Sequence, residues 1–394
     1  MKVVMVHNFY QQAGGEDQVF RAESDLLLSH GHDLVQFTVD NRSINTMGRL
    51  QLAVGAVWNR DIYHKLRELF RRERPDVVHF HNTSPLVSPS GYYAARAEGI
   101  GVVQTLHNFR MVCPSGPLFR DGHLCEECLG KFVPWPGIVH ACYRKSRAAT
   151  AVRTAMLTLH KPVGTWSRIV GRYIALSEFS RQKFIAGGLP PEKILVKPNF
   201  LASNPGVGAH LGGYALFVGR LSPEKGVETI VDAWKAIEGL LPLKIVGGGP
   251  LEAQLRLRAG AASRVDFLGG QTASRVRELM RDAEVLIVPS RCYEGGLPLV
   301  VLEAFSVGLP VIASDLGNLS AGIEHQRTGL LFRPGDPADL GRVLAWAGSR
   351  PEEMALIGGR GRREYEERYT AGTNYRLLME IYSAASAVSL NAPV

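Results

Sequence analysis

The chain alternates short apolar runs with amphipathic stretches from its first residues onward. The runs are rich in Val, Ile, Leu and Phe, which is typical of strands buried on both faces of a parallel sheet. The stretches between them, such as Asp17–His30 and Trp58–Arg74, have the spacing of amphipathic helices. In the first half, the expected strands cover residues 2–7, 33–39, 76–80, 101–106, 172–176 and 193–197.

The same rhythm starts again after a loop-like segment at 198–213, whose Gly, Pro, Asn and Ser content suits a linker between domains. The second series of expected strands covers residues 214–219, 241–247, 264–269, 284–290 and 309–314. Alternating strands and helices predict an α/β fold with two doubly wound parallel-sheet domains, 1–200 and 201–370, facing each other across a cleft. The periodicity after Thr370 predicts a helix within 371–394 that could pack back onto either domain, and it is grouped with the first.

Composition and charge narrow the class of protein. A chain of 394 residues is long for one core, and 45% hydrophobic with 21% charged residues is ordinary for a globular protein. The net charge of +8 divides into +9 for residues 1–200 and −1 for the remainder. A basic first half fits nucleic acid, an acidic membrane or phosphorylated ligands, and it equally fits solvated surface arginines. Nucleic acid is not expected, because no aromatic stacking motif accompanies the charge.

Neither a membrane span nor a leader is expected. No apolar run approaches the roughly 18 residues that a span needs, and the N-terminal MKVVMVHNFY enters a strand pattern directly. The expected location is the cytoplasm, with peripheral contact at the inner face of the membrane left open.

Four loops at expected strand ends could hold phosphate. Gly14-Gly15, the VGGGPL turn and the Gly295-Gly296-Leu297 segment precede expected helices, whose N-termini favour anions, although plain turns explain such glycines too. In GRLSPEKG, Ser222 and Pro223 suit the N-cap and first position of a helix, and Pro298 suits the first position of the helix after Gly296. Arg220 and Lys225 flank that serine and proline, where they could bind pyrophosphate or be ordinary surface cations.

Two acids stand in the stretch from Arg291 to Asp315. Glu294 follows an expected strand, and Glu303 lies inside an apolar helix pattern. A pair of carboxylates can serve acid/base hydrolysis, a metal, a sugar, or only capping.

The motifs GRLSPEKG, VGGGPL and PSRCYEGGLPLVVLEAFSVGLPVIASDLG together resemble the C-terminal half of glycosyltransferase family 4, also called glycosyl transferases group 1, over residues 214–349. HNFYQQAGGEDQVF and TLHNFR match the N-terminal pattern of that family. The resemblance implies a GT-B fold of two Rossmann-like domains. It also implies a retaining transferase that moves a sugar from a nucleotide diphosphate and normally needs no metal. No D-x-D motif occurs in the chain.

The resemblance also implies roles for matching residues. Catalytic roles fall to Arg220 and Lys225, on the donor diphosphate, and to Glu294 and His107, beside the transferred sugar. Glu303 would accept hydrogen bonds from the ribose hydroxyls. The other residues expected to contact the nucleotide-sugar donor are Gly14, Gly15, Gly248, Pro250, Leu268, Gly295, Gly296 and Leu297.

The spacing of the two glutamates departs from the family pattern. The family usually has seven residues between them, whereas eight separate Glu294 from Glu303 here. The extra residue is expected in the Gly295-Gly296 bend, because glycine tolerates it. The helix keeps its register, so the assignment of Glu303 does not depend on the insertion, whereas that of Glu294 does.

Four of the five cysteines fall in an insert at 109–145, namely Cys113, Cys125, Cys128 and Cys142. Cys125 and Cys128 have the C-x-x-C spacing of a zinc knuckle, but a second such pair is absent. A structural zinc and four free thiols both remain open.

Residues 144–172 combine Lys and Arg with Leu, Met, Val and Trp and hold no acid. This segment suits contact with anionic lipid or a lipid-diphosphate acceptor, or it is a core helix with a solvated basic face. By analogy with the family, the acceptor is expected to be a glycan or a lipid-linked intermediate of a bacterial surface polysaccharide. The alternatives are a non-catalytic nucleotide-sugar-binding protein and a dinucleotide-dependent oxidoreductase, but the glycine fingerprint of the latter is missing.

Overall fold

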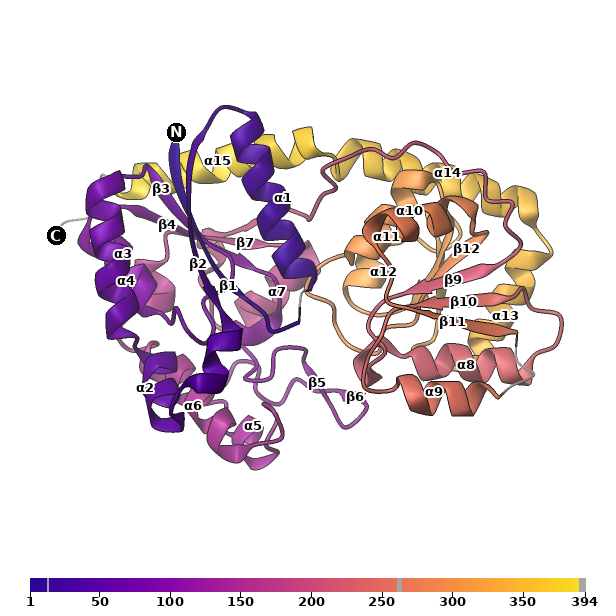
Figure 1. Cartoon of the computed structure of the whole chain (residues 1–394), viewed down its shortest axis with the longest axis horizontal. Helices are drawn as coiled ribbons and strands as arrows, with labels where there is room; N and C mark the ends of the chain where they lie inside the picture. The colour runs from indigo at the N-terminus through magenta and orange to yellow at the C-terminus, as the bar shows by residue number, and fades with distance from the viewer. Residues whose placement is uncertain (13, 261–263, 390–394) are drawn as a thin grey trace. The chain divides into compact units, whose positions relative to one another are not determined.

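The computed structural model describes residues 1–12, 14–260 and 264–389, with side chains described up to residue 386. The chain forms two compact units (Figure 1). The first comprises Met1–Leu118, Cys125–Asn199 and the chain from Ala371 onward, and the second comprises Phe119–Leu124 and Phe200–Thr370. The segment 109–145 is therefore divided between the two units.

A six-stranded parallel sheet forms the centre of the first unit, with strand order β2-β1-β3-β4-β7-β8. Its strands are β1 (Lys2–Phe9), β2 (Asp33–Asp40), β3 (Val77–Phe80), β4 (Gly101–Leu106), β7 (Arg172–Ala175) and β8 (Ile194–Val196). The apolar runs are explained by burial, since the residues of β3 and β4 are buried on both faces of the sheet.

The helices of the first unit pack against this sheet or against one another. They are α1 (Gly15–Ser29), α2 (Arg49–Val57), α3 (Arg60–Glu73), α4 (Ser90–Ala97), α5 (Trp135–Val139), α6 (Arg147–Leu159), α7 (Glu178–Ala186) and α15 (Ala371–Ser389). The last of these is separated from the others by the whole second unit in sequence, yet its Leu378, Ile381 and Tyr382 lie in one core cluster with Val3 and Phe20. Residues 390–394 of the helix expected within 371–394 lie outside the described residues.

The second unit repeats the architecture with strand order β11-β10-β9-β12-β13-β14, again all parallel. Its strands are β9 (Ala215–Val218), β10 (Leu243–Val246), β11 (Val265–Gly269), β12 (Val285–Val288), β13 (Val311–Ser314) and β14 (Leu330–Phe332). Its helices are α8 (Val227–Ala236), α9 (Glu252–Ala259), α10 (Ala273–Asp282), α11 (Leu299–Val307), α12 (Asn318–Gly322), α13 (Pro337–Gly348) and α14 (Pro351–Arg368). Two parallel α/β units confirm the predicted fold class.

Three strands were not predicted. β14 is a three-residue run, and the two-residue strands β5 (Phe119–Arg120) and β6 (His123–Leu124) form an antiparallel hairpin. Each is too short to show a periodicity in the sequence.

Each sheet has one point where the strand order reverses. In the first, the chain leaves β1 for β2 on one side and returns to β3 on the other; in the second, the reversal lies between β9 and β12. Ligands of doubly wound sheets bind at the carboxyl ends of the strands beside such a point. The loops after β1, β3 and β4, and those after β9, β10 and β12, are therefore where chemistry is expected.

No helix within the described residues is both long and apolar enough to cross a membrane.

Candidate active site

The loop after β9 carries the two expected cations of the second unit. Ser222 is the N-cap and Pro223 the first residue of a short 3-10 helix, η5 (Pro223–Lys225), which confirms both expected positions. The α-helix α8 itself begins only at Val227. Between the two helices Gly226 has a φ of 64°, and a Cβ there would lie 2.0 Å from the carbonyl oxygen of Pro289. Only glycine lets this loop approach the chain that follows β12 so closely.

Lys225 and Glu294 meet across the point of reversal. Nζ of Lys225 lies 2.7 Å from Oε1 of Glu294, and Oγ of Ser290 donates a hydrogen bond of 2.6 Å to the same oxygen. The amide of Asn318 donates to the backbone carbonyl of Glu294, which fixes the main chain as well. Burial opposes the charged ammonium, but the nearby Glu294 carboxylate outweighs it, so the pKa of Lys225 is raised.

Arg220 differs from Lys225 in having no partner. Its side chain is exposed, and within the described parts of the chain it makes no ion pair or side-chain hydrogen bond. This loop therefore holds one cation that is neutralised by a carboxylate and one that is open to a ligand.

The glycine-rich turn after β10 lies directly against the β9 loop. Leu221 N–H donates to the carbonyl of Gly248, and Leu251 N–H donates to the carbonyl of Leu221, both at 3.0 Å. A Cβ on Gly247 would lie 1.9 Å from the carbonyl oxygen of Gly219, and one on Gly249 would lie 2.4 Å from that of Leu221. The glycines thus permit two strand-end loops to pack main chain against main chain.

Pro250 and Leu268 are the other two residues of this part of the unit that were expected to contact the donor. Pro250 lies in the exposed turn before α9, and Leu268 is half-buried on β11.

The loop after β12 leads into α11 through Gly295, Gly296 and the buried Leu297. The expectation that Pro298 is the first helical residue is wrong by one position. Its ψ of 141° is extended, so it is the N-cap, and its carbonyl accepts hydrogen bonds from the amides of Val301 and Leu302. The ring still serves the helix start, since it lacks an N–H that would need a partner.

Glu303 lies in α11, half-buried and without an ion-pair or hydrogen-bond partner for its carboxylate in the described structure. Burial raises the pKa of this carboxyl to about 7, against a smaller opposing effect of the charge of Arg277. A carboxylate that forms no ion pair or hydrogen bond with the described residues can accept hydrogen bonds from neutral hydroxyl groups.

In the first unit, the loop after β1 places Gly14 at the N-cap of α1 and Gly15 at its first position. Oδ2 of Asp17 accepts a hydrogen bond from the Gly14 amide, while its Oδ1 lies 2.7 Å from Nε2 of the buried His7. Burial lowers the pKa of His7 to about 4, although the Asp17 hydrogen bond opposes the shift. Asp17 thus fixes the glycine turn to the core of the sheet.

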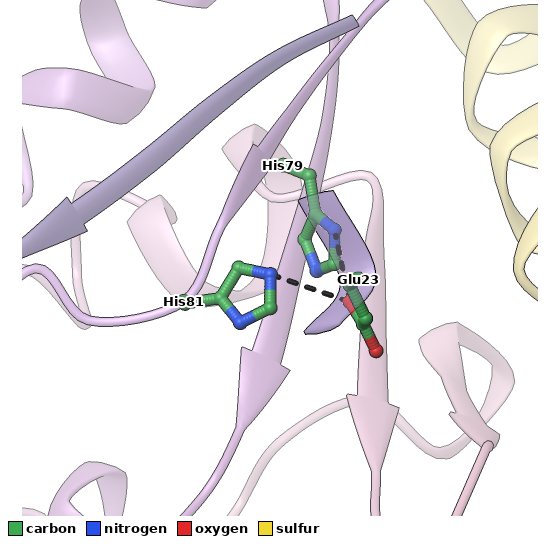
Figure 2. Close-up of side chains that lie close together, drawn as sticks. All are labelled: Glu23, His79 and His81. Carbon is green, nitrogen blue, oxygen red and sulfur yellow. Dashed lines mark ion pairs between the residues drawn. The ribbon is translucent and has the colours of Figure 1, made fainter. Parts of the chain in front are cut away.

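His107 stands just after β4, half-buried, with its Nε2 3.0 Å from Nδ1 of His81. On the other side of His81, Nε2 lies 3.4 Å from Oε2 of the buried Glu23 (Figure 2). The second oxygen of Glu23 is ion-paired with the fully buried Lys197. Burial, followed by the charge of His81, lowers the pKa of His107 well below its ordinary value, so the imidazole is neutral near pH 7.

Sequence reasoning missed the cluster formed by Glu23, His79, His81 and Lys197. His79 lies on β3 and His81 directly follows that strand, and side chains two residues apart on an extended chain face the same side, which is a signal that the HFH motif carried. The ion pair itself joins α1 to the residue after β8, and no local pattern shows such a contact.

Glu23, His79 and His81 offer ligand atoms within 4.8 Å of one another, as a metal site would. However, both ring nitrogens of His79 already have partners, the hydroxyls of Tyr382 and Thr105. Lys197 also neutralises Glu23, so a divalent ion would add uncompensated positive charge to a buried site. The chemistry of this set fits a structural polar network better than a metal.

Cys113, Cys125 and Cys142 all lie near enough to Cys128 to act on its charge. Burial first, and then the charges of Cys113, Cys142 and Cys125, raise the pKa of Cys128 to about 12. Within residues 1–12, 14–260 and 264–389, the Glu23 set is the only group of three ligand atoms within 4.8 Å. The zinc site therefore stays a prediction.

The fold and the site together define a class. Two solved structures match nearly the whole chain. A sucrose-phosphate synthase from Thermosynechococcus elongatus matches with a TM-score of 0.73 and 16% identity, covering 98% of this chain and 99% of that one. HepE from Anabaena in complex with UDP-glucose matches with a TM-score of 0.68 and 18% identity, covering 97% of this chain and 100% of that one. At such identities the likeness shows the fold, which is GT-B.

Family models then identify the chain. The model described as Glycosyltransferase Family 4 matches residues 27–202, and the one described as Glycosyl transferases group 1 matches residues 212–347. The chain belongs to this glycosyltransferase family.

Curated relatives agree at lower coverage. The chain is 29% identical over 161 residues to the D-rhamnosyltransferase WbpZ of Pseudomonas aeruginosa, covering 40% of this chain and 42% of that protein. It is 27% identical over 223 residues to the amylovoran biosynthesis glycosyltransferase AmsK of Erwinia amylovora, covering 53% and 55%. The chain thus spans about half the length of these relatives.

Proposed function

We propose that the chain is a retaining glycosyltransferase that moves a sugar from a UDP- or GDP-linked donor to a glycan or lipid-linked acceptor in bacterial surface polysaccharide biosynthesis. The observation that carries the proposal is the set of side chains at the reversal point of the second sheet. There an open Arg220, a Lys225 paired with Glu294 and an unpartnered Glu303 follow adjacent strands. HepE, which shares the fold, was solved with UDP-glucose.

Each side chain has a chemical task in the proposal. Arg220 supplies a planar fork and Lys225 a point charge for the donor diphosphate, and both stabilise the charge that builds on it as the sugar departs. Two cations at this position perform the task that a metal ion performs in other transferases, so the enzyme works without one. Glu303 accepts hydrogen bonds from the ribose hydroxyls.

Glu294 and His107 act near the transferred sugar in this scheme. Glu294 is held in place by Ser290 and by its main-chain contact with Asn318, so its carboxylate can orient sugar hydroxyls. His107 is neutral, and its contact with His81 orients the imidazole, so it can hydrogen-bond the sugar without adding charge.

The finer features of the proposal concern location and zinc. We place the protein in the cytoplasm, with residues 144–172 in peripheral contact with anionic membrane, because this segment is basic and holds no acid. The thiols around Cys128 would hold a structural zinc, which metal analysis of the purified chain would test.

The test of the proposal is nucleotide diphosphate release. The purified chain is incubated with UDP- and GDP-sugars, alongside Arg220→Ala and Glu303→Ala. We expect binding and slow hydrolysis of one donor by the wild-type chain and at least tenfold weaker binding by each variant, since each lost charged contact is worth about 1.5 to 3 kcal/mol. Binding without release, even when cell-envelope glycolipid is added, would support the alternative of a non-catalytic nucleotide-sugar-binding protein. No binding of any donor, together with unchanged variants, would refute both.

A further inference from the structure

Two arginines of the first unit lie near enough for the charge of one to act on the other. Arg110 belongs to a 3-10 turn, η2 (Phe109–Met111), that follows β4, and Arg153 lies on α6. Arg153 is only 5% exposed. In the described structure, neither guanidinium has a carboxylate within 4.0 Å.

Arg153 is under-satisfied for a buried cation. Its Nη1 donates a hydrogen bond of 2.6 Å to Oγ of Ser84, but its Nε is buried with no partner. Burial, followed by the charge of Arg110, lowers the pKa of Arg153 to about 10. A buried guanidinium normally has a counterion, because an unpaired buried charge costs several kcal/mol.

The surroundings hold the two guanidinium groups without cancelling their charge. Arg110 lies 4.9 Å from the ring centre of Tyr10, and Arg153 lies 4.9 Å from that of Tyr143. Arg110 also donates to the hydroxyl of Tyr10, which in turn bonds the carboxyl of Glu16. Burial raises the pKa of Glu16 to about 7, so the acid near this cluster is only partly charged at neutral pH.

The cluster, defined as Arg110, Arg153, Tyr10, Tyr143 and Glu16, thus carries net positive charge. Its members other than Arg153 are half-buried, so the cluster reaches the surface. Guanidinium forks match the oxygens of phosphate, and an orphan Nε–H marks a missing acceptor.

We propose that this arginine pair binds a phosphate or diphosphate group of the acceptor. The statement that the phosphate belongs to an acceptor rests on the proposed function, whereas the anion site itself depends only on residues of the first unit. The bound phosphate accepts from Nε of Arg153 and from Arg110, and it supplies the counterion that the chain lacks. The acceptor is then a phosphorylated sugar or a lipid diphosphate rather than a neutral glycan.

The test measures binding of inorganic pyrophosphate by calorimetry in full-length Arg220→Ala protein, so that the proposed donor loop contributes little. Arg153→Gln and Arg110→Gln are added separately to this background. The matched control is Arg147→Gln, which removes an exposed arginine at the start of the same helix. We expect at least tenfold weaker binding for Arg153→Gln and Arg110→Gln and less than a twofold change for Arg147→Gln.

Several results would overturn the site. These are the absence of saturable binding in the Arg220→Ala background, equal binding by the Arg153→Gln and Arg147→Gln proteins, and binding of glucuronate in place of pyrophosphate. Arg110→Gln keeps the test decisive if Arg153→Gln fails to fold, because Arg110 is only half-buried.

Two further binding measurements distinguish a lipid-linked phosphate from a water-soluble one and test the donor site separately. Farnesyl diphosphate binding more tightly than pyrophosphate points to a lipid-linked acceptor, and equal binding points to a water-soluble one; both support the site. Binding of UDP and of GDP by the wild-type chain and by the Arg153→Gln single variant is measured in parallel. If the wild-type chain binds neither nucleotide, the proposed function is contradicted and the anion site stands.

Discussion

In the contact between Lys225 and Glu294, the carboxylate of Glu294 stabilises the charged form of the Lys225 ammonium. Without a ligand, the carboxylate holds the ammonium at 2.7 Å and raises its pKa. A diphosphate in the proposed site would have to share this ammonium with Glu294. The pair therefore sets how strongly the loop attracts phosphate before any sugar is recognised.

Glu294→Gln is predicted to separate these two effects. With the carboxylate gone, Lys225 carries its full charge toward the ligand, so UDP alone binds about three- to tenfold more tightly, equivalent to about 1 kcal/mol. Turnover of the nucleotide sugar falls, because the sugar hydroxyls lose their acceptor. Calorimetry with UDP and release assays with the full donor measure the two quantities, and Glu238→Gln, an exposed acid of the same unit, is the control. Weaker UDP binding by Glu294→Gln would contradict this account of Lys225.

Glu303 gives a prediction with a defined pH dependence. Its pKa of about 7 exceeds the ordinary value of 4.5, so the folded chain holds this proton more tightly than the unfolded chain. The carboxyl therefore lowers the free energy of unfolding progressively as the pH rises from 4.5 to about 7, and the effect is complete above that range.

Glu303→Gln should accordingly stabilise the protein at pH 8 by up to about 3 kcal/mol and have almost no effect at pH 4.5. Denaturant unfolding at both pH values measures this, with Glu238→Gln, an exposed acid of the same unit, as control. The same change should weaken UDP binding. Equal stabilisation at both pH values would show that burial does not raise this pKa.

The loops between elements depend on glycine at particular positions. Gly226 has a φ of 64° and a carbonyl where its Cβ would be, whereas Gly239 has a φ of 79° and open space around it. The two glycines share a positive φ, and only Gly226 has a close neighbour at the position of a Cβ.

Gly226→Ala and Gly239→Ala should therefore differ sharply. The second costs only the strain of a left-handed residue, about 1 kcal/mol. The first adds a collision with Pro289 and is expected to cost about 3 kcal/mol or more and to weaken UDP binding, because the loop must move. Thermal unfolding and calorimetry measure both quantities. Comparable losses for the two variants would mean that the approach to Pro289 is not a fixed feature.

The elements were largely predictable from the sequence, for a physical reason. Strands of a parallel sheet are buried on both faces, so they appear as continuous apolar runs such as that of β12. The structure confirms all eleven expected strands and adds β14, β5 and β6, which are too short to be recognised. The helix start at Pro298 was missed by one residue, because proline fits both the N-cap and the first helical position.

The candidate site was predictable only in part. Arg220, Lys225 and Glu294 could be assigned to strand-end loops, because their motifs are contiguous in sequence and resemble a known family, while their roles stay predictions. The Glu23–Lys197 pair and the arginines at 110 and 153 were not found, because their environments are built by segments far apart in the chain. Whether Glu294 contacts the sugar, with eight residues before Glu303, stays a prediction.

At the scale of the whole molecule, the two units should respond differently to acid. In the first unit, burial lowers the pKa of His7 to about 4 and lowers those of His79 and His107. The unfolded chain binds protons on these histidines as the pH falls below 6.5 and the folded chain does not, so stability is lost below that pH. His7 alone accounts for about 3 kcal/mol between pH 6.5 and pH 4. The contribution of Glu303, in the second unit, to the free energy of unfolding changes with pH in the opposite direction.

Hydrogen exchange of the full-length protein at pH 7.5 and pH 5, corrected for intrinsic rates, measures this difference. Peptides from β3 and β4 should lose more protection at low pH than peptides from β9 and β12. Greater loss in the second unit would contradict the assignment of the neutral buried histidines.

The central claim is that the loops after β9, β10 and β12 bind a nucleotide diphosphate. A crystal structure of the protein with UDP, or with the UDP- or GDP-sugar that it releases, tests this most directly. We predict the diphosphate beside Arg220 and Lys225 and the ribose hydroxyls within hydrogen-bond distance of Glu303. A nucleotide bound elsewhere, or with its ribose away from Glu303, would contradict the account.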